Sequence, residues 1–593
     1  MGDFIKMLLA SCLGIVIGLV SIFFIGGLVF STFASSMEKP TDLKPNSVIK
    51  LTLTDPIPEL TNNVQTSPLE AGLDDADVLG LHDIVDAIER AKDDDRIKGI
   101  YLEPSLTFAA GFTTARSIRN ALEDFKDSGK FVYAHSKFYT QGQYYLSSVA
   151  DEIYANPMGY FEVNGFSAVR PFYKDMLDRI GVKMQIFYAG KFKSATEPFR
   201  RKEMSPESKE QLRASINDLY SVFLDDVSSS RKMDKAQLKK VVDQFLADSP
   251  ENAKANGLID DLVYREEVYE KMKEKMGLSE DDKLEMVSLK SFNASNKADR
   301  NYKIKERIAV VYAEGTIIDG KGNNGSVGDY LYVKDINRLA EDDRVDAMVL
   351  RVNSPGGSAL SSENIWKALV NFKETGKPLV ISMGDYAASG GYYIACLGDK
   401  IYAEPNTLTG SIGVFRVIPS LQKTFDKMGI SYDSVKTGPF AAGLNFSFDM
   451  SPAEQRKMQA NTEEAYQVFL QRVADGRSMK VDEVHKIAQG RVWTGMQALN
   501  NGLVDELGGL EDAIAEAAKL ADLDEFRLVS YPKVKDPLQQ LIEDLLNQGS
   551  QEARIEQSIK ATFPQFAPHY QLLRDLNTSK GLQARSTVII PFE

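Results

Sequence analysis

The chain has 593 residues, of which 43% are hydrophobic and 26% charged, and it carries a formal net charge of −14. This length exceeds what a single hydrophobic core supports and fits two large domains with appendages. The Lys and Arg residues form no dense cluster, so the sequence argues against a nucleic-acid surface, which needs cations to neutralise phosphates.

The first predicted element is a membrane anchor within residues 1–36. Met7–Phe30 is an uncharged run of mainly Leu, Ile, Val, Phe and Gly, and a bilayer core needs about 20 such residues in a helix. The run exceeds the roughly 7–15 apolar residues of a cleaved signal peptide, although the small residues at 34–36 leave cleavage as an alternative. The positive charge of Lys6 precedes the run, whereas residues 38–44 after it carry both charge signs. This difference favours an N-terminus on the cytoplasmic side and the bulk of the chain on the extracytoplasmic side.

Strands alternate with helices in the first half of the remaining chain, residues 45–295, which follows a polar linker. Apolar and β-branched runs predict strands at 49–53, 97–103 and 130–136, and helical spacing predicts helices at 82–91 and 115–125. Ser205, Pro206 and Glu207 provide a helix start for a long helix. The charged stretch 280–301 is interpreted as the link between halves.

The second half, residues 302–525, repeats this order. Expected strands lie at 308–313, 347–352, 378–383 and 400–405, with helices at 333–341 and 361–372 and a long helix opened by Ser451, Pro452 and Glu454. Such alternation predicts an α/β fold with mainly parallel sheets and right-handed crossovers. Residues 526–593 are expected to form an irregular tail.

The two halves are predicted to be copies of one domain. Residues 385–395, DYAASGGYYIA, align without a gap on residues 137–147, KFYTQGQYYLS, at an offset of 248 positions. The same offset superposes DDRVDAMVL at 342–350 on DDRIKGIYL at 94–102. A constant register over roughly a hundred residues indicates an internal duplication.

The copies disagree at residues that carry chemistry. Ser389, between small residues, matches Gln141 in the first half. Lys193, in GKFKSATEPF, matches Ala441 in the second half. One half has kept a serine and the other a lysine, which predicts a single catalytic site assembled from both.

The sequence NSPGGSA, residues 353–359, lies between a predicted strand and a predicted helix. Adjacent glycines there let the backbone approach a ligand and present N–H groups to a phosphate or an oxyanion. Neither GxGxxG nor GxxxxGK[ST] is present, so a nucleotide site loses its main support. A plain turn is the alternative, but the matching residues 106–109 of the first half lack a glycine pair.

A serine nucleophile requires a base, and histidine is scarce. The four histidines lie away from both motifs, and none has the spacing of a metal site, so a Ser-His-Asp triad and a bound metal are not expected. A neutral lysine can serve as base where burial lowers its pKa. Lys193 lies among apolar residues, and Lys191 is its rival two positions away. A tightly packed helix start is the structural alternative for Ser389.

Five motifs give the chain a specific resemblance. It resembles the long-form bacterial signal peptide peptidases of the protease IV type, and the resemblance covers nearly all of the chain after the anchor. The matching motifs are RVNSPGGS, MGDYAASGGYYIA, LTGSIGV, GKFKSATEPF and GRVWTGMQALNNGLVDELGG. The resemblance implies two tandem domains similar to the Clp-protease and crotonase folds, with no cofactor.

The family pattern implies a role for each matching residue. Ser389 is the expected nucleophile, Lys193 the expected general base, and Ser411 the serine expected to hydrogen-bond the lysine. The backbone N–H groups of Gly390 and of the pair Gly356 and Gly357 are expected to form the oxyanion hole. Asp385, four residues before the nucleophile, departs from the family pattern, so the substrate preference of this chain is expected to differ there from that of other members.

The expected function is membrane-anchored endopeptidase activity on apolar peptides such as released signal peptides. The resemblance further implies a homotetramer held to the bacterial inner membrane by its N-terminal helix, with catalytic domains in the periplasm. Two alternatives stay open: a crotonase-like acyl-CoA enzyme, which would need neither the serine–lysine pair nor an anchor, and an inactive membrane scaffold.

Overall fold

The computed structural model describes residues 43–53, 57–64, 78–105, 110–295, 304–534 and 583–585. The predicted anchor Met7–Phe30 lies outside these ranges. Within them, no helix is both long enough and apolar enough to cross a membrane.

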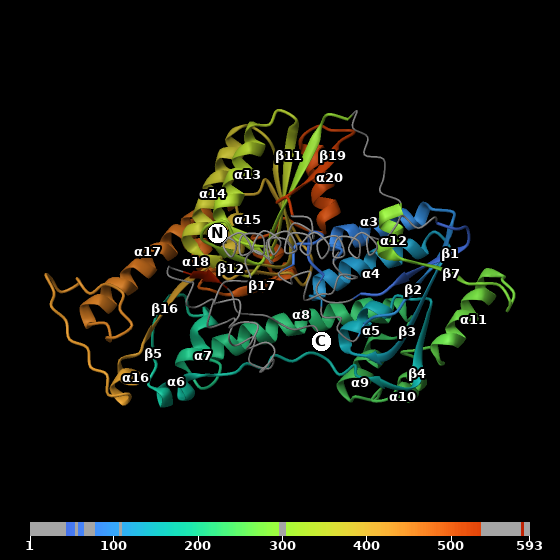
Figure 1. The fold of residues 1–593 in the computed structure, drawn as a ribbon, viewed down its shortest axis with the longest axis horizontal. Helices are drawn as coiled ribbons and strands as arrows, with labels where there is room; N and C mark the ends of the chain where they lie inside the picture. The colour runs from blue at the N-terminus through green and yellow to red at the C-terminus, as the bar shows by residue number, and fades with distance from the viewer. Residues whose placement is uncertain are drawn as a thin grey trace, which may run out of the picture.

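The first half builds a sheet with the strand order β6-β4-β3-β2-β1-β7 (Figure 1). Every pairing between its described strands is parallel, as the alternation predicted. The strands are β1 (Ser47–Leu51), β2 (Ile97–Leu102), β3 (Phe131–Tyr139), β4 (Glu152–Phe161), β6 (Asp261–Leu262) and β7 (Glu285–Ser288).

The second half repeats this sheet. Its strands follow the order β18-β14-β13-β11-β8-β19, which matches the first sheet position by position and supports the duplication at the level of the fold. They are β8 (Arg307–Glu314), β11 (Val345–Ser354), β13 (Leu379–Ala388), β14 (Lys400–Ala403), β18 (Glu506–Leu507) and β19 (Arg527–Tyr531). Two short strands extend it: β15 (Leu408–Gly410) pairs parallel with β13, and β17 (Val492–Thr494) pairs antiparallel with β15.

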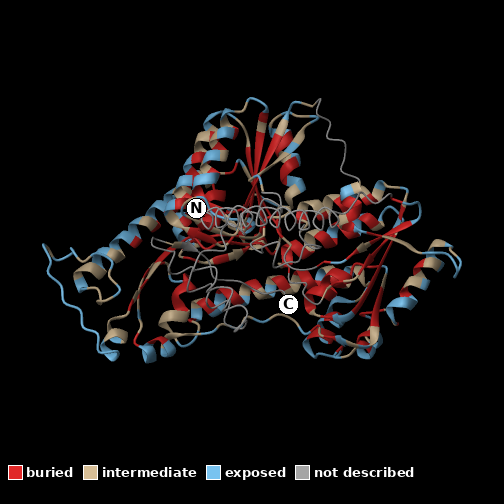
Figure 2. Ribbon diagram, in the orientation of Figure 1, coloured by how far each residue is buried: buried red, intermediate tan, exposed pale blue. Residues whose placement is uncertain are grey.

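Helices cover both sheets, and buried side chains concentrate along the strands between them (Figure 2). In the first half they are α3 (Leu81–Asp93), α4 (Phe112–Lys126), α5 (Gln141–Ser147), α6 (Lys174–Ile180), α7 (Glu197–Arg200), α8 (Pro206–Ser230), α9 (Lys235–Asp243), α10 (Pro250–Ala255), α11 (Arg265–Met276) and α12 (Leu289–Ser295). In the second half they are α13 (Asp329–Glu341), α14 (Ala359–Glu374), α15 (Gly390–Ala395), α16 (Gln422–Lys427), α17 (Pro452–Arg477), α18 (Val481–Ile487), α19 (Gly495–Asn500) and α20 (Leu510–Leu520).

The two long helices begin where the sequence predicted. The side chain of Ser205 accepts a hydrogen bond from the Ser208 N–H at the start of α8. Ser451 forms a capping box with Glu454 at the start of α17. In both helices the cap is followed by proline at the first helical position, where its missing N–H costs no hydrogen bond.

Two stretches interpreted from sequence as a link and a tail contain regular structure. The presumed link at 280–301 contains β7 and α12, and it buries Val287, Leu289 and Phe292 despite its charged composition. The tail predicted to begin at residue 526 first contributes β19, which pairs with β8. Both strands are short edge strands beside the first strand of their sheet, so their apolar pattern is too brief to detect.

A third sheet joins the halves. It has the order β10-β9-β12-β20-β16-β5 and contains β5 (Lys183–Ala189), β9 (Thr316–Ile318), β10 (Ser326–Gly328), β12 (Gly356–Ser358), β16 (Val414–Ser420) and β20 (Gln583–Arg585). Strand β5 of the first half pairs antiparallel with β16 of the second, with Ala189 opposite Val414. This register brings the residues that follow Ala189 close to those that precede Val414.

Candidate active site

Ser389 lies at the sharp turn between β13 and α15. It is fully buried, with φ 58° and ψ −114°, a conformation that costs a non-glycine residue energy. The Ser389 N–H donates to the Gly410 carbonyl at 2.8 Å, which fixes the turn against β15. Small neighbours are required, because a Cβ on Gly391 would lie 2.5 Å from the Ser354 carbonyl oxygen. The turn therefore presents the Ser389 hydroxyl at the carboxyl end of the sheet.

Lys193 comes from the first half, four residues after β5. Its φ of −71° and ψ of 75°, with the Ser194 N–H donating to the Phe192 carbonyl at 2.7 Å, define an inverse γ-turn centred on the lysine. The turn packs against the second half, where a Cβ on Gly490 would lie 2.7 Å from the Lys193 Cβ. Gly490 thus provides the space that lets Lys193 enter the site.

The structure brings Lys193, Ser389 and Ser411 together. Lys193 Nζ lies 2.8 Å from Ser389 Oγ, 2.8 Å from the Ser411 carbonyl oxygen and 3.0 Å from Ser411 Oγ. All three residues are buried, with at most 2% of each exposed. The contact between serine and lysine spans the two halves of the chain, as the division of residues between the repeats predicted.

Burial holds the pKa of the Lys193 amine well below its ordinary value. It is the only cause of this shift, and no carboxylate among the described residues offsets it. A neutral amine has two N–H donors and a lone pair. The Ser411 carbonyl can only accept, so it takes one N–H, and the lone pair remains able to accept the proton of the Ser389 hydroxyl. The site therefore favours the base form of Lys193.

Lys191, the rival base, lies elsewhere. Its side chain is exposed and its Nζ sits 5.0 Å from the centre of the Phe192 ring. Lys191 and Lys193, two positions apart, thus face different environments, because Lys191 is exposed to solvent and Lys193 is buried against Ser389.

One of the expected oxyanion donors already has a hydrogen-bond partner. Gly390 is the first residue of α15, where N–H groups have no partner within the helix. The Gly356 N–H donates to Ser354 Oγ at 3.2 Å. Gly357, on β12, lies opposite Ala584 of β20. The Gly390 N–H therefore has no partner within its helix, whereas the Gly356 N–H already has one.

A segment from the far end of the chain, β20, lies between β12 and β16. Strand β20 pairs antiparallel with β12 on one side, and Gln583 also pairs antiparallel with Phe415 of β16 on the other. An extended segment thus fills the place between the glycine strand and the strand that follows Ser411. Nothing in the sequence pattern of the tail indicated this position.

The positions that the repeat offset makes equivalent to Ser389 and Lys193 carry neither a nucleophile nor a base. Gln141 begins α5, and its side-chain oxygen accepts hydrogen bonds from the N–H groups of Asn164 and Gly165, each at 3.1 Å. The glutamine thus fills the place that the repeat offset assigns to a serine. Ala441, the counterpart of Lys193, lies exposed in the loop before α17.

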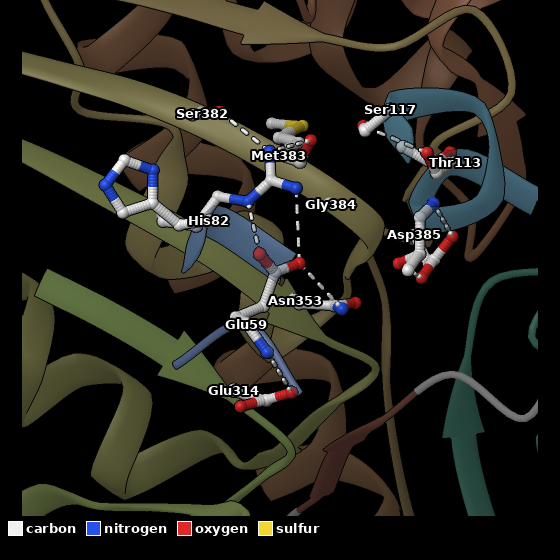
Figure 3. Close-up of polar contacts among 12 residues, drawn as sticks. Glu59, His82, Thr113, Ser117, Glu314, Asn353, Ser382, Met383, Gly384 and Asp385 are labelled. Atoms are coloured by element: carbon white, nitrogen blue, oxygen red, sulfur yellow. Dashed lines mark hydrogen bonds and ion pairs between the residues drawn. The ribbon is translucent and has the colours of Figure 1, made fainter. Parts of the chain in front are cut away.

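A buried charged cluster joins the first half of the chain to β11 (Figure 3). Glu59, from the first half, pairs with Arg351 at 2.9 Å and accepts a hydrogen bond from the Asn353 side chain at 3.0 Å. Its own N–H donates to Glu314, whose pKa is raised to about 8 by burial and by the Glu59 carboxylate. Sequence reasoning missed Glu59, because a single glutamate in a polar segment carries no pattern.

The Asp385 side chain contacts the first half of the chain. Its carboxylate accepts hydrogen bonds from the Thr114 N–H at 3.1 Å and the Thr114 hydroxyl at 2.6 Å, at the N-terminus of α4 (Figure 3). Burial raises the pKa of the Asp385 carboxyl, and the two hydrogen bonds from Thr114 offset part of this rise. The expectation that Asp385 influences substrate preference does not fit this position. The residue instead ties the strand of Ser389 to α4.

The described residues contain no group of three or more His, Cys, Asp or Glu side chains placed to hold a metal ion. The buried histidine His135 lies on β3 of the first half and contacts the Val263 carbonyl.

Comparison with known proteins places this site in context. Residues 124–279 and 371–524 match the model of peptidase family S49. The chain is 38% identical to Protease 4 of Salmonella typhi over 492 residues, which cover 82% of this chain and 78% of the relative. It is 36% identical to Protease 4 of Haemophilus influenzae, covering 84% and 83% of the two chains. It is 32% identical to the chloroplastic serine protease SPPA of Arabidopsis thaliana, covering 86% and 74%.

Proposed function

Since the chain belongs to peptidase family S49 and is a serine peptidase of the long, protease 4 type, we propose that Ser389 and Lys193 form its catalytic dyad. The observation that carries this proposal is the 2.8 Å contact between Lys193 Nζ and Ser389 Oγ in a buried site. General-base catalysis requires the two groups within hydrogen-bond reach and a base with a lowered pKa. Ser411 orients the amine through its carbonyl and hydroxyl.

The mechanism follows from this geometry. Ser389 Oγ attacks the carbonyl carbon of the scissile peptide bond while its proton passes to the neutral amine of Lys193. The N–H groups of Gly357 and Gly390 stabilise the resulting oxyanion. The tetrahedral intermediate collapses, the C–N bond breaks, and Lys193 returns the proton to the leaving amine. A water molecule, deprotonated by the same lysine, then hydrolyses the acyl-enzyme and releases Ser389.

The position of β20 supports a binding mode for the substrate. A peptide added between β12 and β16 would gain main-chain hydrogen bonds from both neighbours, as in strand-addition complexes. We propose that substrates bind as an extended strand antiparallel to β12, where Gln583–Arg585 lie in this structure. The substrate class we propose is apolar peptides, such as signal peptides released into the membrane.

A membrane-held homotetramer is the assembly we propose. The apolar run Met7–Phe30 supports an anchor, with the catalytic halves on the periplasmic side of a bacterial inner membrane. A projecting arm made by β5, β16, α6, α16 and the loop at 428–450 supports self-association (Figure 1). Large apolar side chains on this arm are unusually exposed, among them Met428, Val435, Phe440, Leu444 and Phe446. Such patches suit contact with further copies of the chain.

The shared strand order of the two parallel sheets supports the finer fold assignment, tandem domains similar to the Clp-protease and crotonase folds. Neither alternative function matches the site as well. An acyl-CoA enzyme has no need of a serine–lysine contact, and an inactive scaffold has no need of a strained serine turn beside a buried amine.

Covalent labelling tests the proposal. A serine-directed fluorophosphonate should label the wild-type protein at one residue, Ser389, and Ser389→Ala should lose both labelling and peptide cleavage while keeping its circular dichroism spectrum. Cleavage of an apolar peptide by Ser389→Ala, above the background of an uninduced preparation, would exclude Ser389 as the nucleophile.

A further inference from the structure

Gln211, on α8, touches both sides of the lysine turn. Its side-chain N–H group donates to the Phe192 carbonyl and to the Ser194 hydroxyl, each at 3.1 Å. These are the two residues that flank Lys193 in the γ-turn. Only 1% of Gln211 is exposed, so the amide is dedicated to these contacts and not to solvent.

The same amide reaches the second half. The Gln211 side-chain oxygen accepts a hydrogen bond from the Val492 N–H at 3.1 Å. Val492 begins β17 and lies opposite Gly410 of β15, and the Gly410 carbonyl holds the Ser389 N–H. One side chain therefore connects the turn of the base to the strand pair that holds the nucleophile.

Ser411 depends on the same strand pair. It follows Gly410 directly, and its N–H donates to the Arg491 carbonyl at 2.7 Å. Arg491 precedes Val492, the residue held by Gln211. The strand pair β15–β17 thus holds the Ser389 and Ser411 oxygens that contact Lys193 Nζ, and Gln211 connects this strand pair to the lysine turn.

We propose that Gln211 is a positioning residue of the peptidase, which sets the placement of Lys193 against Ser389 and Ser411. This inference rests on the proposed dyad and extends it to a residue on a helix of the first half. A neutral amide suits the role because it offers a donor to one half and an acceptor to the other without placing a charge beside the base. A displacement of about 1 Å at such a site lowers the rate on the order of 100-fold.

The charged groups around the turn leave the base undisturbed. Lys191 is exposed over the Phe192 ring, Arg491 pairs with Glu210 at 2.6 Å, and Glu197 accepts from the Ser205 N–H at 3.1 Å. None of them contributes to the lowered pKa of Lys193, whose cause is burial. A carboxylate introduced at residue 211 would be a new charge in this environment.

Two substitutions separate positioning from general stability. Gln211→Met keeps the length and removes all three hydrogen bonds, so kcat should fall about 10- to 100-fold while KM stays within about twofold, because β12 and β16 are untouched. Gln211→Glu should lower kcat at neutral pH and also move the pH midpoint of activity upward by about one unit, because an anion near Lys193 favours its protonated form.

Gln459→Met is the matched control. Gln459, on α17, also bridges the halves, donating to the Tyr188 carbonyl at 3.3 Å, but it does not touch the lysine turn. It should keep the wild-type kcat and pH midpoint. If Gln211→Met does not fold, Gln211→Asn, which retains the amide but is one methylene shorter, carries the same expectation for kcat and KM.

The measurement is the steady-state rate on an apolar fluorogenic peptide from pH 6 to pH 10, with thermal unfolding of each variant as a check of folding. A folded Gln211→Met or Gln211→Asn with wild-type kcat, or one that changes KM as much as kcat, overturns the inference. So does a Gln211→Glu profile with an unchanged midpoint. If Lys193→Ala is itself active, the dyad fails; if it is inactive and the Gln211 variants are normal, only the role of Gln211 fails.

Discussion

Raising the pH should raise the activity of this peptidase, because only the neutral amine of Lys193 can accept the Ser389 proton. The perturbation is titration of a single group whose pKa is depressed by burial. A depressed lysine pKa means that the competent form is present above that pKa and is lost as the pH falls through it. Activity should therefore rise with pH and reach a plateau well below the ordinary lysine pKa of about 10.4.

The size of the effect follows from the contacts of the amine. Lys193 Nζ contacts two hydroxyls and one carbonyl and no titratable group. The rising part of the pH–rate profile should therefore reflect the loss of a single proton. Below the pKa the rate should fall about tenfold per pH unit, which corresponds to about 1.4 kcal/mol per unit. Removing the base should cost on the order of 100- to 10,000-fold. Arg at this position stays protonated at any usable pH, so Lys193→Arg should be as inactive as Lys193→Ala.

The assay is cleavage of an apolar fluorogenic peptide from pH 6 to pH 10, in parallel with the rate of fluorophosphonate labelling. The second readout reports the nucleophilicity of Ser389 without the later steps. Lys191→Ala is the matched control, because this exposed lysine is two residues from the base and should contribute only surface charge. The four separate His→Ala variants should keep activity, since no histidine is needed.

Three results would refute this reasoning. Lys193→Arg with near-normal turnover would show that no neutral amine is required. A folded but inactive histidine variant would point to a different base. An inactive Lys191→Ala beside an active Lys193→Ala would leave the serine mechanism standing and place the base two residues earlier.

Other substitutions test the division of the site and its access. Gln141→Ser should not rescue Ser389→Ala in peptide cleavage, because the position equivalent to Lys193 is occupied by Ala441 and supplies no base. Gly490→Ala should lower the cleavage rate at least tenfold, on the order expected for a displaced base, because the new Cβ would lie 2.7 Å from the Lys193 Cβ. Replacing both Gln583 and Ala584 by proline should raise the initial rate of peptide cleavage. Adjacent prolines remove an N–H facing each neighbouring strand, so β20 should no longer occupy the proposed substrate position between β12 and β16.

Each of these has a matched control. Gly429 shares a left-handed φ, 74° against 77°, but has open space around it, so Gly429→Ala should leave the rate unchanged. A Gly490→Ala rate equal to that of Gly429→Ala would contradict the steric argument. Gln583→Ala with Ala584→Gly keeps both N–H groups and should behave as wild type. A proline variant slower than this control would show that β20 supports the active form.

The repeats made much of this architecture predictable from sequence. Long apolar strands such as β8 and β11 and capped helices such as α8 and α17 carry strong local signals, because periodicity and caps act within a few residues. Ser389 and Lys193 were found by comparing the halves, since each repeat shows what the other has lost. Their contact also required the β5–β16 pairing, which no local pattern reveals.

Other parts of the site had no such signal. Glu59 and Gln211 are single polar residues, and each has a partner more than 250 positions away in the chain, Arg351 and Val492 respectively. Their roles come from tertiary placement alone, as does the position of β20. The short edge strands β7 and β19 were missed for a related reason, because their neighbours and not their composition hold them in the sheet.

The joining of β5 to β16 has a genetic consequence. Each chain carries a complete reacting pair, with serine and lysine 196 positions apart on the same polypeptide. Alleles encoding Ser389→Ala and Lys193→Ala should therefore fall into one complementation group, because mixing the two mutant chains in an oligomer restores neither site. If the duplication divided the dyad between the copies as proposed, each copy depends on the other, and loss of either half should abolish activity.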